Sequence, residues 1–173
     1  MSIRPFESIF PNIAETAFID SASTVIGDVK VGHGSSIWPG AVIRGDVNTI
    51  RIGERTSIQD GVIIHATHAG PFSGQGFATI IGDDVTVGHQ AIIHGCTIQD
   101  RVLVGMGSKI LDGAVIESDS MIGAGSLVPP GKKLESGFLY YGSPVSQIRL
   151  LDEKELDFLC YMAEHYVKLA QRH

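Results

Sequence analysis

An aliphatic residue recurs every sixth position along most of the chain. The spacing is interrupted three times, by a three-residue insertion after Ile43, a longer break after Ile64 and a one-residue slip after Ile93. Glycine often follows the aliphatic residue, and a small or β-branched residue often lies four positions after it. The repeated positions are Ile19, Val25, Val31, Ile37, Ile43, Ile52, Ile58, Ile64, Ile81, Val87, Ile93, Ile98, Val104, Ile110, Ile116, Ile122, Val128 and Leu134.

This spacing excludes an α-helix and favours short strands separated by tight turns. A helical face needs apolar residues three and four positions apart, and glycine at this frequency would destabilise it. Six-residue periods are typical of parallel β-helices, in which three hexapeptides make a coil and stacked coils bury a common core. Chance alternation in a β-sandwich is a weaker explanation, because so many positions match one template. We predict a mainly-β protein, a parallel β-helix of about five coils.

Two segments before the C-terminal region depart from the repeat. Residues 1–18 have no clear period, and we expect them to cap the β-helix, which we place at 19–145. Residues 66–80 interrupt the repeat and contain glycine and proline, so we predict a loop that projects from one face. Projecting loops of this kind are favoured sites of function. All of residues 1–173 would form a single domain.

Residues 151–172 read as an amphipathic α-helix that packs along the β-helix. Asp152 and Glu155 have the spacing of a capping box, which favours a helix start at this point. The expected apolar stripe, which would face the core, consists of Leu156, Leu159, Cys160, Ala163, Val167 and Ala170.

The bulk composition limits the environments and the binding partners to be expected for this protein. Hydrophobic residues make up 43% and charged residues 18%, so a packed core is expected rather than disorder. The formal net charge of −6 argues against nonspecific binding to nucleic acid or to an anionic membrane. The chain has no apolar run long enough for a membrane span, and its 2 cysteines do not form a disulfide framework. We therefore expect a soluble, cytoplasmic protein.

Two histidines share a phase in the repeat. His65 directly follows the repeat residue Ile64, and His94 directly follows Ile93, so both side chains should point outward. Their separation of 29 residues equals one coil plus a remainder that the projecting loop can absorb. On this reasoning the two imidazoles stack on adjacent coils, about 4.8 Å apart, which is close enough to share a metal ion.

His89 has a different phase, because it lies two positions after Val87. It should fall near another edge of the prism, from which it reaches the His65–His94 pair only if it comes from a neighbouring subunit around a threefold axis. Three neutral imidazoles with an open fourth position are typical of a catalytic zinc site. The seven histidines could instead simply decorate the surface, since the spacing of His89 and His94 is not a standard ligand signature.

Several stretches resemble the γ-class carbonic anhydrases in order and spacing. The likeness covers nearly the whole chain, and its most specific features are the RGD, IQD, IH and GH-x4-H motifs. Hexapeptide repeats alone would also fit many acyltransferases. The stretches are WPGAVIRGDV (38–47), IGERTSIQDGVIIH (52–65), VTVGHQAIIHGC (85–96) and the segment 103–145.

The resemblance implies a left-handed β-helix that assembles as a homotrimer with metal sites at the subunit interfaces. His65 and His94 would come from one subunit and His89 from its neighbour. The family carries zinc, and some members use Fe2+ or Co2+. The implied reaction is the reversible hydration of CO2 to bicarbonate, through attack of metal-bound hydroxide.

The same likeness assigns roles to residues around the metal. Arg44 matches an arginine that pairs with interface carboxylates, and Asp46 and Asp60 match those carboxylates; for Arg44 a purely structural role in assembly is favoured. Gln59 matches a residue that hydrogen-bonds the metal-bound water or bicarbonate. Tyr166 resembles a helix tyrosine found near the site in short members of the family.

One departure from the family pattern bears on turnover. The well-characterised enzymes carry glutamates on a loop near the metal as proton shuttles, whereas the segment between His65 and Asp83 has no carboxylate. This argues for a slow or absent reaction. The exposed imidazole expected at His68 could take the place of these glutamates, because histidine titrates near neutral pH, or it could be a loop residue without a role in proton transfer. Two alternatives to a carbonic anhydrase remain: a metal-binding protein without turnover, or an acyltransferase or thioesterase on the same scaffold.

Overall fold

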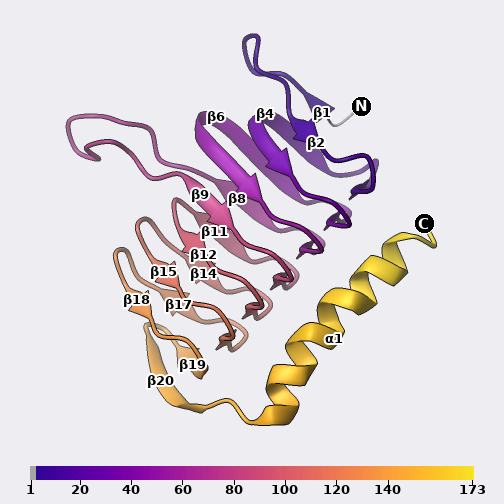
Figure 1. The fold of residues 1–173 in the computed structure, drawn as a ribbon. Helices are drawn as coiled ribbons and strands as arrows, with labels where there is room; N and C mark the ends of the chain where they lie inside the picture. The colour runs from indigo at the N-terminus through magenta and orange to yellow at the C-terminus, as the bar shows by residue number, and fades with distance from the viewer. Residues whose placement is uncertain (1–2) are drawn as a thin grey trace.

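The computed structural model describes residues 3–173, which form a β-helix with a single α-helix along one side (Figure 1). The β-helix has about eight turns rather than the five expected from the repeat. The elements are β1 (Ile3–Arg4), β2 (Asn12–Ile13), β3 (Phe18–Ile19), β4 (Thr24–Val31), β5 (Ser36–Ile37), β6 (Val42–Ile52), β7 (Ser57–Ile58), β8 (Ile63–His65), β9 (Thr79–Ile81), β10 (Thr86–Val87), β11 (Ile92–His94), β12 (Thr97–Ile98), β13 (Leu103–Val104), β14 (Lys109–Ile110), β15 (Val115–Ile116), β16 (Met121–Ile122), β17 (Leu127–Val128), β18 (Lys133–Leu134), β19 (Phe138–Gly142), β20 (Val145–Leu150) and α1 (Glu153–Ala170).

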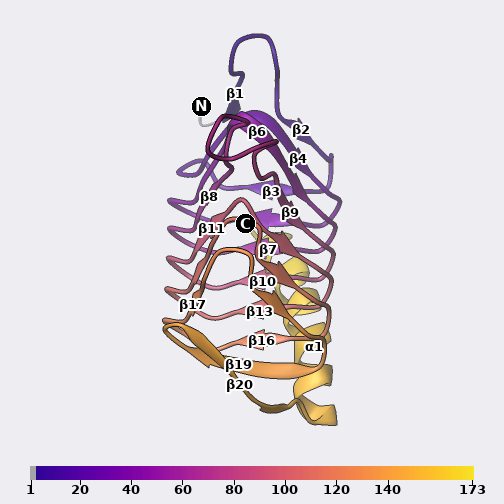
Figure 2. The same ribbon diagram turned by 90° about the vertical axis from the view of Figure 1, so that its left-hand side faces the viewer.

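The strands up to β19 stack in parallel from coil to coil, as the six-residue period predicts, and β20 pairs antiparallel with β19 (Figure 2). One sheet holds β3, β5, β7, β10, β13, β16, β19 and β20. The other sheet wraps around two faces, because the long strand β6 pairs with β8 through its first part and with β9 through its last part. Equivalent repeat residues align in the ladders, for example Ile43 beside Ile64 and Ile64 beside Ile93. These side chains are fully buried and form one continuous core.

The extra turns come from both ends of the repeat, where the six-residue spacing is lost. At the N-terminal end, β1 and β2 both pair in parallel with β4, so this segment carries strands of the sheet. At the other end, Tyr140 of β19 continues the ladder below Ile122 and is itself buried. The expected five coils are too few for two reasons: the eighteen repeat positions already fill six coils at three per coil, and the strands at both ends do not follow the hexapeptide spacing.

Close approach between coils explains the glycines that follow repeat residues. A Cβ atom added to Gly88 would lie 2.8 Å from the backbone nitrogen of Met106, and one added to Gly105 would lie 2.5 Å from that of Ala124. Both distances are too short for real carbon–nitrogen contacts, and the obstructing atoms belong to backbone that is fixed by the ladder. Glycine is therefore required at this corner for the coils to stack.

The helix α1 begins with the capping box expected from the sequence. The Asp152 carboxylate accepts a hydrogen bond from the Glu155 backbone N–H at 2.9 Å, and the Glu155 side chain accepts one from the Asp152 N–H at 3.0 Å. Leu159 and Ala163 are the buried residues of the helix, which packs against β5, β7 and β10. The expectation that Cys160 belongs to this stripe is wrong: its side chain is exposed, because the buried stripe runs along the other side of Leu159.

The segment between β8 and β9 projects from the coils as a long loop (Figure 1). Its base is closed by two backbone hydrogen bonds of 2.9 Å between Thr67 and Phe77. Phe72 near its tip is fully exposed. Within residues 3–173, no helix is long and apolar enough to cross a membrane.

Coil stacking predicts different effects for two neighbouring glycines. Gly107 has a positive φ of 67° but open space around its Cβ position, so Gly107→Ala should cost about 1–2 kcal/mol in backbone strain. Gly105→Ala should lower the melting temperature further, because its methyl group would force adjacent coils apart. Thermal unfolding of the two variants measures the difference. An equal or smaller loss for Gly105→Ala would contradict the close-approach explanation.

Candidate metal centre

The two histidines with the same phase lie side by side. His65 at the end of β8 pairs in register with His94 at the end of β11, which confirms the stacking predicted from the repeat. The Nδ1 atom of His65 faces the Nε2 atom of His94 at 3.2 Å. Register between adjacent coils therefore brings together two imidazoles that are separated by 29 positions in the chain.

Each of these imidazoles uses its other nitrogen to contact a carboxylate. His65 Nε2 lies 3.0 Å from Asp46 Oδ1, and His94 Nδ1 lies 2.6 Å from Asp112 Oδ1. An ionised carboxylate can only accept hydrogen bonds, so the imidazole nitrogen facing it carries the proton. In the neutral rings, the two nitrogens that face each other then both present lone pairs. Two lone pairs at this separation repel each other unless a cation lies between them.

The separation of the facing nitrogens fits a metal ion. Zinc binds imidazole nitrogen at about 2.0–2.1 Å in tetrahedral geometry, which places two such ligands about 3.3 Å apart. The observed distance of 3.2 Å between His65 Nδ1 and His94 Nε2 matches this separation of two ligand nitrogens. A histidine ligand whose second nitrogen donates to a carboxylate is also the usual arrangement around protein-bound metals. His65 and His94 therefore fit two of the ligand positions of such a site.

Arg44 and Asp46, predicted as interface residues, contact each other within one chain. Arg44 Nη1 lies 2.5 Å from Asp46 Oδ2, while the other carboxylate oxygen contacts His65. Burial acts to raise the pKa of Asp46, but the hydrogen bonds from Arg44 and His65 outweigh burial and hold the pKa below its usual value. Asp46 thus stays ionised and keeps the proton of His65 on the outer nitrogen.

His89 lies at a different corner, after β10, and its imidazole contacts a different carboxylate, that of Asp60. Its Nδ1 atom is 2.9 Å from Asp60 Oδ2, and its backbone N–H donates to Gln59 Oε1 at 3.2 Å. Among residues 3–173, no three His, Cys, Asp or Glu side chains are close enough to hold a metal ion together. His89 therefore does not join the His65–His94 pair within one chain, as its different phase predicts.

Three of the predicted site residues line one groove between α1 and the coils. Gln59, His89 and Tyr166 share a volume of about 260 Å³ with apolar side chains that include Met106 and Phe158. Burial raises the pKa of Tyr166, and the nearby negative charge of Asp60 adds to this effect, so the phenol remains a neutral hydrogen-bond donor at physiological pH. The groove combines an apolar wall with an amide, an imidazole and a phenol.

His68, the suggested proton shuttle, lies on the projecting loop and is exposed to solvent. Its backbone carbonyl accepts a hydrogen bond of 2.6 Å from the hydroxyl of Ser73, which holds that part of the loop in a turn. The imidazole is therefore accessible to buffer, and the loop that carries it starts directly after His65.

Sequence reasoning missed Asp112. Asp112 follows His94 by 18 positions, the length of one coil, and this spacing was the available signal. Cys96, two residues after His94, is buried, and burial raises the pKa of its thiol to about 12, so the thiol stays protonated and unreactive at neutral pH.

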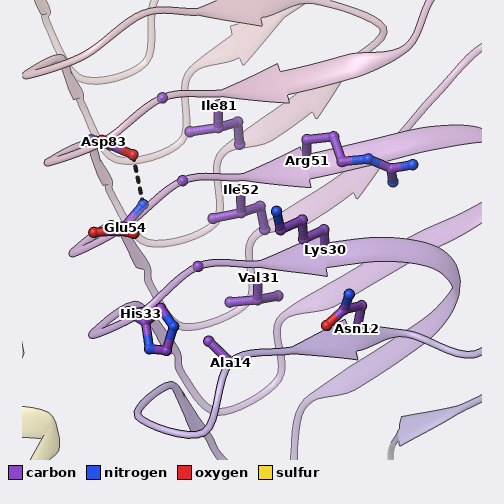
Figure 3. Close-up of a pocket in the computed structure, with 13 residues that line it drawn as sticks. Asn12, Ala14, Lys30, Val31, His33, Arg51, Ile52, Glu54, Ile81 and Asp83 are labelled. Atoms are coloured by element: carbon purple, nitrogen blue, oxygen red, sulfur yellow. Dashed lines mark hydrogen bonds between the residues drawn. The ribbon is translucent and has the colours of Figure 1, made fainter.

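A second, wider pocket lies at the N-terminal coils and contains none of the predicted site residues (Figure 3). Its volume is about 580 Å³, and its wall includes Lys30, Arg51 and Glu54. The Arg51 guanidinium is neutralised by Asp28, whose Oδ1 lies 2.7 Å away, and the Glu54 backbone N–H donates to Asp83 at 2.7 Å. The Arg51 charge is thus balanced by a carboxylate outside the pocket lining.

Comparisons with known proteins assign the chain to a family. The family model described as bacterial transferase hexapeptide (six repeats) matches residues 10–45 and 95–130. Protein YrdA of Escherichia coli (strain K12) is 55% identical over 166 residues, which cover 96% of this chain and 90% of YrdA. A carbonic anhydrase of Geobacillus kaustophilus is 43% identical, over 98% of this chain and 89% of the relative.

A solved structure agrees closely with the fold. The crystal structure of a protein from Bacillus cereus, described as a putative acetyltransferase, superposes with a TM-score of 0.92 at 43% sequence identity. The match covers 98% of this chain and 95% of that chain. The chain belongs to the hexapeptide-repeat family that contains YrdA and the γ-carbonic anhydrases.

Proposed function

We propose that this protein is a metal-dependent γ-carbonic anhydrase that converts CO2 and water reversibly into bicarbonate and a proton. The observation that carries the proposal is the pair of imidazole nitrogens, on His65 and His94, that face each other at 3.2 Å with their outer nitrogens held by carboxylates. Relatives named carbonic anhydrases, at 43% and 48% identity, support the same reaction.

Zinc is the metal that we propose, with Fe2+ or Co2+ as substitutes that imidazole ligands also accept. His65 would bind it through Nδ1, and His94 through Nε2. When bound, zinc lowers the pKa of a coordinated water to about 7 and thereby supplies a nucleophile at neutral pH. Asp46 and Asp112 would keep the two imidazoles in the protonation state that leaves these nitrogens free to bind.

The third ligand, His89, would come from a neighbouring copy of the chain in a homotrimer. Its Nδ1 atom contacts Asp60, so Nε2 is the nitrogen available for a metal. The surface beside the His65–His94 pair supports a partner there: Val42, Ile63 and Ile92 align across β6, β8 and β11 on the outward side of the sheet, and Ile63 is exposed. An outward-facing row of aliphatic side chains is typical of a contact surface between subunits.

Gln59 and the groove would contribute to substrate binding. The amide oxygen of Gln59 accepts from the backbone of His89, so the amide nitrogen is the donor that Gln59 offers to the groove. An amide donor suits an oxygen of bicarbonate, and the apolar wall formed by Met106 and Phe158 suits CO2, which is small and has no net dipole. We propose that Tyr166, which lines the same groove, acts as a second donor.

The direct test is stopped-flow CO2 hydration by purified protein loaded with zinc, or with Fe2+ under anaerobic conditions. We expect hydration above the uncatalysed rate and one metal ion per chain. His89→Ala should lose both, because the third ligand is missing from every interface. His33→Ala provides the matched control, since His33 is exposed and outside the groove, and it should behave like the wild type.

Two other outcomes would replace the proposed function. Metal binding at one ion per chain without hydration above the His89→Ala background would indicate a metal-binding protein without turnover. Acetyl transfer from acetyl-coenzyme A by metal-free protein, without CO2 hydration, would indicate the activity suggested by the description of the Bacillus cereus structure.

His68 is proposed as the group that passes the product proton to buffer. Because this proton leaves after bicarbonate has formed, His68→Ala should lower kcat while kcat/KM is unchanged. At low buffer concentration we expect a loss of up to about 100-fold, in the lower range of general acid–base effects. Added imidazole should restore kcat in this variant. An unchanged kcat at low buffer concentration would remove His68 from the mechanism.

A further inference from the structure

We infer that Asp112 is a positioning residue that holds His94 in the protonation state and orientation needed to bind metal. The inference rests on the proposed metal site and adds to it a residue from the coil that follows His94. Asp112 lies in the turn between β14 and β15, and its Oδ1 accepts from His94 Nδ1 at 2.6 Å. This leaves Nε2 of His94 without a proton and directed at His65.

The Asp112 carboxylate is itself fixed from a second side. Its Oδ2 atom accepts a hydrogen bond of 2.7 Å from the hydroxyl of Thr67, at the base of the projecting loop. Both oxygens are therefore engaged, and rotation of the carboxylate would break one contact or the other. A short hydrogen bond to an ionised acceptor is stronger than a neutral one, so this arrangement restrains the His94 ring.

Thr67 is in turn held by the backbone. Its N–H and C=O pair with Phe77 across the loop base at 2.9 Å, and its carbonyl oxygen accepts a second bond of 3.0 Å from the side chain of Asn48. The chain of contacts from Asn48 through Thr67 and Asp112 ends at His94. It ties the base of the projecting loop to the metal site.

Asp112 differs from Asp46 in its surroundings. Asp46 shares its charge between Arg44 and His65, whereas in the described part of the chain Asp112 forms no salt bridge with a Lys or Arg side chain and contacts the imidazole of His94. An unshared negative charge raises the electron density on the imidazole and strengthens it as a ligand. Losing Asp112 should therefore weaken metal binding by more than the loss of one hydrogen bond.

The test compares zinc affinity and the protonation of His94 in four variants. Asp112→Ala and Asp112→Asn remove the charge, Thr67→Val removes the supporting hydroxyl, and Thr67→Ser keeps it. Zinc affinity is measured by competition with a chelator on the assembled protein. The 15N shifts of the His94 ring in metal-free protein report which nitrogen carries the proton.

We expect both Asp112 variants to bind zinc about 10- to 100-fold more weakly, the usual effect of losing such a partner. Their His94 rings should no longer hold the proton on Nδ1 alone. Thr67→Val should weaken binding less, and Thr67→Ser should match the wild type. Asp100→Asn is the control, because Asp100 accepts a backbone bond at 2.9 Å from Asp83 and is not hydrogen-bonded to a histidine.

The outcomes separate this inference from the proposed function. Unchanged zinc affinity and an unchanged His94 proton in Asp112→Ala would overturn the positioning role. A wild-type protein that binds zinc but does not hydrate CO2 would overturn the proposed function and leave the positioning role intact, because neither readout depends on turnover. An equal loss of affinity in Asp100→Asn would show a general effect of surface charge and would also overturn the inference.

Discussion

The parallel register between stacked coils is the constraint on which the rest of the structure depends. It aligns Ile64 with Ile93 inside the prism and, one position later, His65 with His94 outside it. The same register brings Asp112 from the following coil to the outer nitrogen of His94. A slip of one residue would turn the aliphatic side chains outward and separate the imidazoles, so core packing and site geometry are fixed by the same pairing.

The site is divided between two corners of the molecule. At one corner, His65 and His94 present free nitrogens and are supported by carboxylates; at another, His89 is supported by Asp60 and lies in the groove with Gln59. If the three histidines share one metal ion, as we propose, this division gives a chemical reason for assembly, because one chain presents His65 and His94 at one place and His89 at another. Each histidine has one carboxylate partner, so each keeps one nitrogen for a metal.

Much of the fold and of the candidate site could be predicted from the sequence, because the repeat has a strict phase. The phase predicted the parallel β-helix, the stacking of His65 on His94 and the separate position of His89. It undercounted the coils, since β1, β2 and β19 join the ladders without hexapeptide spacing. It also missed Asp112, whose role depends on the contact of a side chain with the adjacent coil. Cys160 was misplaced because helical spacing alone does not say which edge of an apolar stripe meets the core.

If a complete metal site needs two chains, as we propose, two variants that each lack one part of it should complement each other when they assemble together. His89→Ala keeps the His65–His94 pair, and His94→Ala keeps His89, so neither should bind metal at the shared site when assembled alone. Mixed trimers, isolated with two different affinity tags, should regain one complete site, measured as one zinc ion per mixed trimer. Mixed trimers that bind no more zinc than either variant alone would contradict a site shared between two chains.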